Sequence, residues 1–244
     1  MKIEFYEEFP NKNNLKKLKT LNFPTKIFLA AKSISEFKKY ESIAKKYKKD
    51  VEIAYWPIIK NSYWISPFAN NKDLVELFKD LDKIKNSLLI DLELPLAKRW
   101  KMYFKNLFDF RKNKKLIKEF LEKNKNRITT AEYAHVFSKS RKILGLSYNV
   151  NHEKSIMFYT SVRSEKLNEK IRNNLKQIKN KPNYSISLGT IAIGILENEP
   201  ILTPENLERD LKFIKKIGFD KIIIFRLEGL NKKYLKIIHK FIKK

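Results

Sequence analysis

The chain has 244 residues and no cysteine, and 43% of its residues are hydrophobic and 13% aromatic. This composition predicts a folded globular protein, and it excludes disulfide frameworks and thiolate metal sites. The formal net charge of +26 is typical of nucleic-acid-binding proteins. The basic residues are mostly lysines on the polar faces of predicted helices, whereas base and phosphate recognition prefers arginine. Nucleic acid is therefore an alternative partner and not the favoured one.

Eight short runs of β-branched and aromatic residues alternate along the chain with lysine-rich segments that have helical apolar spacing. Such alternation predicts parallel β-strands connected by α-helices. The predicted strands cover residues 2–9, 25–31, 51–59, 87–94, 127–136, 154–161, 184–191 and 221–228. The predicted helices cover residues 11–21, 33–49, 71–85, 97–125, 138–146, 162–180, 203–217 and 231–243.

Several predicted helices have recognisable ends. Ser33 and Thr203 occupy N-cap positions, Pro204 follows at a first helical position, and Gly218 ends the seventh helix. Eight strand–helix units in a chain of this length predict a single-domain α/β protein, a (β/α)8 TIM barrel over residues 1–244. An open doubly wound sheet is the main alternative, but no strand-to-helix turn carries a glycine-rich phosphate-binding motif.

Neither a metal, a cofactor nor a membrane segment is expected from the sequence. The three histidines, His135, His152 and His239, lack the spacing of metal ligands. The first ten residues include Glu4, Glu7 and Glu8 instead of an apolar run, and no window approaches the roughly 20 apolar residues of a membrane span. We therefore expect a cytoplasmic protein.

Two carboxylates mark the end of the fourth predicted strand, SLLIDLELP over residues 87–95. Catalytic groups of such barrels lie at the C-terminal ends of the strands. Because side chains alternate along a strand, Leu89, Asp91 and Glu93 should all face the barrel mouth. The alternative is that the pair only forms ion pairs with lysines at the rim. We favour a functional pair.

The same alternation gives the other strands an inward face. The predicted inward residues are Glu4, Tyr6 and Glu8, with Glu7 as the alternative on that strand, then Glu52, Ala54 and Trp56, Ile128, Thr130 and Glu132, Met157, Tyr159 and Ser161, and Ile224, Arg226 and Glu228. Aromatic faces combined with carboxylates are a usual lining for sugars. We therefore predict a carbohydrate or other small-molecule ligand, bound by Tyr6, Glu8, Trp56, Trp64, Tyr159, Arg226 and Glu228.

A buried Arg226 needs an acidic partner, and we predict an ion pair with Glu4 or Glu52.

The segments LLIDLE (88–93) and MFY (157–159) resemble the D-x-E and M-x-Y motifs of glycoside hydrolase family 18 barrels. The resemblance implies that Glu93 is the general acid, that Asp91 orients it and stabilises a participating acetamido group, and that Tyr159 helps to hold that group. The full family pattern is D-x-x-D-x-D-x-E. Asn86 and Leu89 stand where its first two aspartates belong, and Thr160 replaces the aspartate that usually follows the tyrosine.

Glycoside hydrolysis also requires a second group besides the acid. It is a second carboxylate about 5 Å away for retention or roughly 6.5–9.5 Å away for inversion, or else a substrate acetamido group. Glu132 on the fifth predicted strand is the best protein candidate, so the predicted catalytic residues are Glu93, Asp91 and Glu132. Two alternatives stay open: a non-catalytic barrel that binds a glycan or small metabolite, and a lysine-rich nucleic-acid-binding protein.

Overall fold

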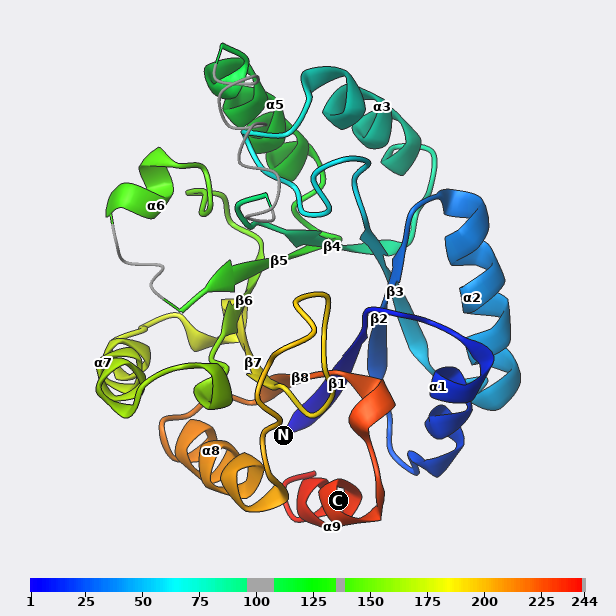
Figure 1. The fold of residues 1–244 in the computed structure, drawn as a ribbon, viewed down its shortest axis with the longest axis vertical. Coiled ribbons are helices and arrows are strands. Elements are labelled where there is room, and N and C mark those ends of the chain that lie inside the picture. Colours follow the sequence, from blue (N-terminus) through cyan, green and yellow to red (C-terminus); the bar gives the residue numbers. More distant parts are fainter. Residues whose placement is uncertain (96–107, 135–138, 243–244) are drawn as a thin grey trace.

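The computed structural model describes residues 1–95, 108–134 and 139–242. Its eight strands are parallel, follow one another in chain order around a closed barrel, and are surrounded by helices (Figure 1). The first strand pairs with the last, with Lys2 opposite Lys221 and Tyr6 opposite Phe225, which closes the sheet. The predicted (β/α)8 barrel is confirmed, and the open doubly wound sheet is excluded.

Each predicted strand corresponds to an observed strand. The strands are β1 (Lys2–Glu7), β2 (Lys26–Ala31), β3 (Glu52–Pro57), β4 (Ser87–Asp91), β5 (Ile128–Tyr133), β6 (Glu153–Met157), β7 (Tyr184–Gly189) and β8 (Lys221–Phe225). The described α-helices are α1 (Lys12–Lys16), α2 (Ile34–Tyr47), α3 (Asn71–Leu81), α5 (Phe110–Lys123), α6 (Lys139–Ile143), α7 (Glu165–Lys176), α8 (Pro204–Lys216) and α9 (Lys232–His239). Parts of the predicted elements lie outside the described residues, namely 97–107, 135–136, 138 and 243.

The predicted helix ends are also found. The Ser33 hydroxyl accepts a hydrogen bond from the Glu36 backbone N–H at 3.2 Å, and Thr203 does the same for Asn206 at 3.3 Å. Pro204 is the first residue of α8, and Gly218 follows that helix with a φ of +87°, a conformation that favours glycine. Local sequence therefore determines where these helices begin and end.

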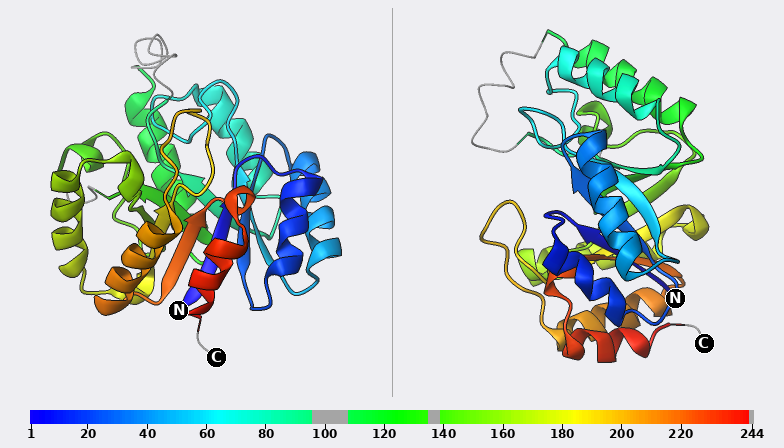
Figure 2. Two further views of the ribbon diagram at one scale, coloured as in Figure 1. Left: turned by 60° about the horizontal axis from the view of Figure 1, so that its bottom comes forward. Right: turned by 90° about the vertical axis from the view of Figure 1, so that its right-hand side faces the viewer.

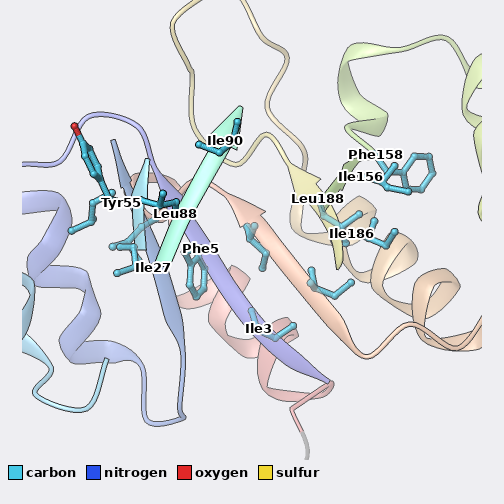
Figure 3. Packing of buried hydrophobic residues seen from close by; sticks show 14 of the residues in the cluster. Ile3, Phe5, Ile27, Tyr55, Leu88, Ile90, Ile156, Phe158, Ile186 and Leu188 are labelled. Carbon is cyan, nitrogen blue, oxygen red and sulfur yellow. The ribbon is translucent and has the colours of Figure 1, made fainter. Parts of the chain in front are cut away.

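Alternation along the strands separates two apolar layers. Figure 3 shows side chains of the outer layer, between the strands and the helices, including Ile3, Phe5, Leu88 and Ile156. The inner layer fills the barrel and consists of Tyr6, Phe28, Ala30, Ala54, Trp56, Ile58, Leu89, Ala131, Ile223 and Phe225. Fully burying one large apolar side chain stabilises the fold by about 1.5–3 kcal/mol. Together the two layers fix the position of every strand end.

The predicted inward face of β5 is wrong by one residue. Ala131 and Tyr133 face the barrel interior, whereas Thr130 and Glu132 face outward. On that outer face the Thr130 hydroxyl lies 3.0 Å from a Glu132 oxygen, and the Lys154 ammonium lies 3.4 Å from the same oxygen. The outer face of β5 therefore carries a buried polar cluster at Thr130 and Glu132.

The predicted inward face of β8 is wrong for a different reason. Ile223 and Phe225 point into the barrel, and Ile224 packs in the outer layer. A strand of a parallel sheet is buried on both faces. A continuous apolar run such as KIIIF therefore does not indicate which of its side chains face the barrel interior.

Arg226 follows β8 and is buried, as predicted, but its acidic partner is neither Glu4 nor Glu52. Its Nη1 atom lies 3.1 Å from Glu7 Oε1, and its Nη2 atom contacts the Glu228 carboxylate. The Glu7 carboxylate also accepts a hydrogen bond from the Asn14 amide on α1 at 3.2 Å, so Glu7 faces this helix and not the barrel interior. Glu4 and Glu52 instead lie near the Lys2 ammonium.

The Arg226–Glu7 pair connects three parts of the chain. The guanidinium donates to the Ile193 carbonyl from Nε at 3.1 Å and from Nη2 at 2.6 Å, and Glu7 Oε2 accepts from the Glu228 backbone N–H at 2.8 Å. The pair therefore joins the ends of β1 and β8 to the loop that follows β7.

Among the described residues, no helix combines the length and the apolar character needed to cross a membrane.

We expect the Arg226→Met substitution to lower the free energy of unfolding by about 3–5 kcal/mol at pH 8, because it leaves the Glu7 carboxylate buried without its charge partner. Urea denaturation measures this loss. The double variant Glu7→Gln/Arg226→Met should be more stable than Arg226→Met alone, since it removes the uncompensated charge.

The matched control is Lys212→Met, which removes an exposed ion pair with Glu208 on α8 and should cost less than about 1 kcal/mol. Equal stability of Arg226→Met and this control would contradict a structural role for the buried pair.

Candidate active site

A cavity of about 390 Å³ opens at the C-terminal ends of the strands. The loop 190–203, between β7 and α8, extends over the barrel opening (Figures 1 and 2). The side chains that carry chemistry in the cavity lining are Tyr6, Glu8, Trp56, Trp64, Asp91, Glu93, Tyr133, Tyr159, Arg163 and Glu199.

Aromatic rings form the floor of this cavity. The ring centroid of Tyr6 lies 5.6 Å from that of Trp56 and 6.3 Å from that of Phe225, which in turn lies 5.8 Å from Tyr159. The Tyr6 hydroxyl is held 2.9 Å from the Ser187 hydroxyl inside the barrel. The floor is therefore apolar and fixed in orientation.

Asp91 and Glu93 enter the cavity together from the end of β4. The two carboxyl groups are hydrogen-bonded to each other, and the Tyr133 hydroxyl donates to Glu93 Oε2 at 2.5 Å. Burial raises the pKa of Asp91 well above its usual range, and repulsion by Glu93 and Glu8 adds to this effect. Burial also raises the pKa of Glu93, and its hydrogen bonds with Tyr133 and Asp91 partly oppose this effect. The pair therefore retains a proton at pH values where exposed carboxyl groups have lost theirs.

Trp64 reaches the same place through the loop after β3. The backbone N–H of the next residue, Ile65, donates to the Asp91 carbonyl at 3.0 Å, which ties this loop to the end of β4. Tyr63 packs edge-on against Trp64, with ring centroids 5.4 Å apart. The loop thereby places one aromatic ring beside the carboxyl pair.

Glu8 is a third acid in the cavity. Its Oε1 accepts a hydrogen bond from the Tyr63 hydroxyl at 2.6 Å. Burial raises the pKa of Glu8 to about 7, which the Tyr63 hydrogen bond and Arg226 partly oppose. Glu8 is thus able to gain or lose a proton near neutral pH.

Three buried polar atoms of the cavity residues have no hydrogen-bond partner among the residues that the structure describes: Glu8 Oε2, Trp56 Nε1 and Asp91 Oδ1. Buried polar groups are normally paired, so such atoms need a partner from outside the chain. Two acceptor or donor carboxyl oxygens and one N–H donor are therefore available to a bound molecule.

The loop after β7 lines one side of the cavity, and at Gly194 its backbone lies close to two acids. The Glu199 carboxylate accepts from the backbone N–H groups of Gly194 and Leu196, each at 3.2 Å. A Cβ atom at Gly194 would lie 2.9 Å from Glu8 Oε2 and 2.8 Å from Glu199 Oε1. The loop backbone therefore packs directly against these two acids.

The structure brings together most of the predicted site residues and excludes three. Asp91, Glu93, Tyr6, Glu8, Trp56, Trp64 and Tyr159 all line the cavity. Glu132 does not, because it faces the polar cluster outside β5. Arg226 and Glu228 do not line it either, because they pair with one another beside the cavity. The predicted placement of these three residues in the cavity lining is therefore wrong.

Sequence reasoning missed Tyr133, Arg163 and Glu199 as cavity residues. Tyr133 would have been predicted as a cavity residue if the other face of β5 had been assigned to the barrel interior. Arg163 and Glu199 lie in irregular segments, where residue spacing carries no information on orientation. Among the described residues, no group of three or more His, Asp or Glu side chains is arranged to hold a metal ion.

No protein-family model and no curated protein matches this sequence. Solved structures do match. A GH18 chitinase from Pseudoalteromonas aurantia superposes with a TM-score of 0.61 and 11% identity, over 99% of this chain and 100% of the other. A chitinase from Chromobacterium violaceum ATCC 12472 gives 0.56 and 8% over 98% of both chains. A D-tagatose 3-epimerase-like protein gives 0.53 and 14% over 98% of this chain and 95% of the other. The likeness shows a (β/α)8 barrel.

The raised pKa of Glu8 predicts a specific pH dependence of stability. A buried acid whose pKa rises from 4.5 to about 7 on folding favours the folded state in its neutral form, and this contribution is lost as the pH rises through that window. Between pH 4.5 and pH 8 the free energy of unfolding should fall for the wild type because Glu8 ionises. We expect this fall to be about 2–3 kcal/mol smaller for the Glu8→Gln variant, which has no ionisable group at this position. Urea denaturation at a series of pH values measures the difference.

The control is Glu119→Gln, which changes an exposed acid on α5 and should follow the wild-type curve. Parallel curves for Glu8→Gln and the wild type would show that Glu8 titrates like an exposed acid.

Proposed function

We propose that the cavity binds a carbohydrate and that the Asp91–Glu93 pair supplies the acid for hydrolysis of a glycosidic bond. The observation that carries the proposal is that the adjacent carboxyl groups of Asp91 and Glu93 line the cavity together with an aromatic floor. Sugar rings stack their C–H faces on aromatic rings, while their hydroxyl groups need hydrogen-bond partners. The unpartnered atoms of Glu8, Trp56 and Asp91 supply such partners. The chitinases and the D-tagatose 3-epimerase-like protein with this fold are named for carbohydrates, which supports the same ligand class.

In this proposal Glu93 donates its proton to the glycosidic oxygen as the bond to the anomeric carbon breaks. A general acid must hold its proton near the working pH, and burial provides this here. Asp91 keeps a proton within the pair through its hydrogen bond to Glu93. The Tyr133 hydroxyl fixes the orientation of the Glu93 carboxyl group.

A second group must attack the anomeric carbon when the glycosidic bond breaks. It is either an acetamido oxygen of the substrate or a water molecule from which Glu8 removes a proton. The resemblance to family 18 favours a substrate acetamido group held near Tyr159, which lines the cavity. Glu8 is the protein alternative, because it lines the same cavity and its charge raises the pKa of Asp91. With its pKa near 7, Glu8 is suited to act as a base.

One observation favours a binding protein without catalysis. Leu89, two residues before Asp91 on the same face of β4, packs in the apolar barrel interior where the family pattern has an aspartate. Asn86 hydrogen-bonds with Lys38 and Glu41 near α2 and not with the carboxyl pair. Asp91 therefore interacts with Glu93 without help from the two aspartates of the family pattern. Binding without turnover is the second candidate function.

We expect Glu93→Gln to abolish hydrolysis and to leave sugar binding within about threefold of the wild type, because glutamine keeps the shape and hydrogen bonding but has no acidic proton. General acid catalysis typically contributes about 10²–10⁴-fold to the rate. Asp91→Asn should slow the reaction and shift the acidic limb of its pH profile. Assays with chitin-type oligomers and a panel of aryl glycosides measure turnover, and calorimetry measures binding.

The control variant is Glu122→Gln, an exposed acid on α5 that should leave both measurements unchanged. Full turnover by Glu93→Gln would refute the assignment of the acid. Sugar binding without turnover in the wild type would establish the binding function instead.

A further inference from the structure

We propose that the ligand carries a carboxylate group and that Arg163 binds this group on the Glu93 side of the cavity. The inference rests on the proposed carbohydrate function and names the class of sugar.

Arg163 lines the cavity, and its side chain makes a single hydrogen bond within the described part of the chain. It follows the short 3-10 turn Thr160–Val162 after β6 and lines the cavity. Its Nη1 atom donates to the Met157 carbonyl at 3.1 Å, which holds the side chain against the end of β6. A guanidinium group has five N–H donors, so with one backbone contact among residues 1–95, 108–134 and 139–242 most of its hydrogen-bonding capacity is free for a bound molecule.

The chain provides no acid that pairs directly with Arg163. In the described part of the chain, Arg163 belongs to none of the ion pairs, which include those of Arg172, Arg209 and Arg226. Segments 96–107 and 135–138 contain neither aspartate nor glutamate, so their side chains cannot supply one.

Glu93 is the nearby acid that influences Arg163, but its carboxyl group is already engaged. It accepts from the Tyr133 hydroxyl and shares a hydrogen bond with Asp91. Arg163 therefore lies close enough to Glu93 to affect its charge without forming an ion pair with it.

A second cation strengthens the positive charge at this edge. The Arg141 guanidinium lies over the Tyr133 ring, 4.6 Å from its centroid, and its buried Nη1 atom has no hydrogen-bond partner. Arg141 and Arg163 repel one another, and both interact electrostatically with Glu93. Arg141 also interacts with Glu132 outside the barrel, whereas Arg163 lines the cavity itself.

The acids that line the cavity beside Arg163 favour a carboxylate over a phosphate as the ligand group. The planar guanidinium fork of Arg163 matches the two oxygens of a carboxylate in a bidentate arrangement. A doubly charged phosphate would add a further negative charge beside Asp91, Glu93 and Glu8. The fitting ligands are sugars with one carboxylate, such as uronic acids or hexosamines that carry a lactyl ether.

Calorimetry with matched ligand pairs tests the inference. The pairs are 4-nitrophenyl β-D-glucuronide with the corresponding glucoside, and N-acetylmuramic acid with N-acetylglucosamine; glucose 6-phosphate with glucose tests phosphate. We expect the carboxylated member of at least one pair to bind about tenfold or more tightly than its neutral partner. In Arg163→Gln this preference should fall to about one, with the affinity of the neutral member unchanged.

Two further variants make the result specific. Arg163→Lys keeps the charge without the fork and should retain part of the preference, and it remains informative if the glutamine variant is poorly folded by circular dichroism. Arg111→Gln removes an exposed arginine on α5 and should retain the full preference.

The outcomes separate the two proposals. Equal binding of neutral and carboxylated sugars by the wild type would overturn the anionic ligand and leave carbohydrate binding intact. A preference that survives in Arg163→Gln would also overturn it, and a preference limited to glucose 6-phosphate would replace carboxylate with phosphate. Binding of no sugar from any pair would overturn both proposals.

Discussion

The buried contact between Glu7 and Arg226 is the interaction on which the arrangement of the barrel mouth depends. It joins the first strand to the last, where the sheet closes, and the same guanidinium holds the carbonyl of Ile193 in the loop after β7. That loop contributes Glu199 to the cavity and packs against Glu8. Closure of the sheet and closure of the cavity are therefore mechanically connected through one arginine.

The cavity buries carboxyl groups at positions where removal from water destabilises their ionised forms. Asp91, Glu93 and Glu8 all have raised pKa values for the same first reason, which is removal from water. Burial destabilises the ionised form of a carboxyl group. The group therefore stays protonated to a higher pH and can donate that proton. Burial raises the pKa of Glu7 as well, but there the ion pair with Arg226 opposes the effect. The separation of paired and unpaired acids distinguishes the residues that hold the barrel from those suited to chemistry.

The sequence was sufficient for the fold and for part of the candidate site. Periodicity predicted eight strand–helix units, and alternation placed Asp91, Glu93 and Tyr6 on the inner face because their strands mix apolar and polar positions clearly. The same rule failed for β8, where isoleucines occupy both faces, and for β5, where the outer face is polar. Contacts made by irregular segments, such as those of Arg163, depend on tertiary packing and leave no periodic pattern.

Gly194 has a consequence for the size of molecule that the barrel accepts. Its missing side chain leaves room for the carboxyl oxygens of Glu8 and Glu199 and for the edge of Phe225, which would lie 2.8 to 2.9 Å from a Cβ atom. Any larger residue at this position must displace the loop or one of these three side chains, all of which line the cavity. The size of the residue at position 194 therefore sets the distance between the loop after β7 and the aromatic floor. Substitutions at this position would change the height of the cavity.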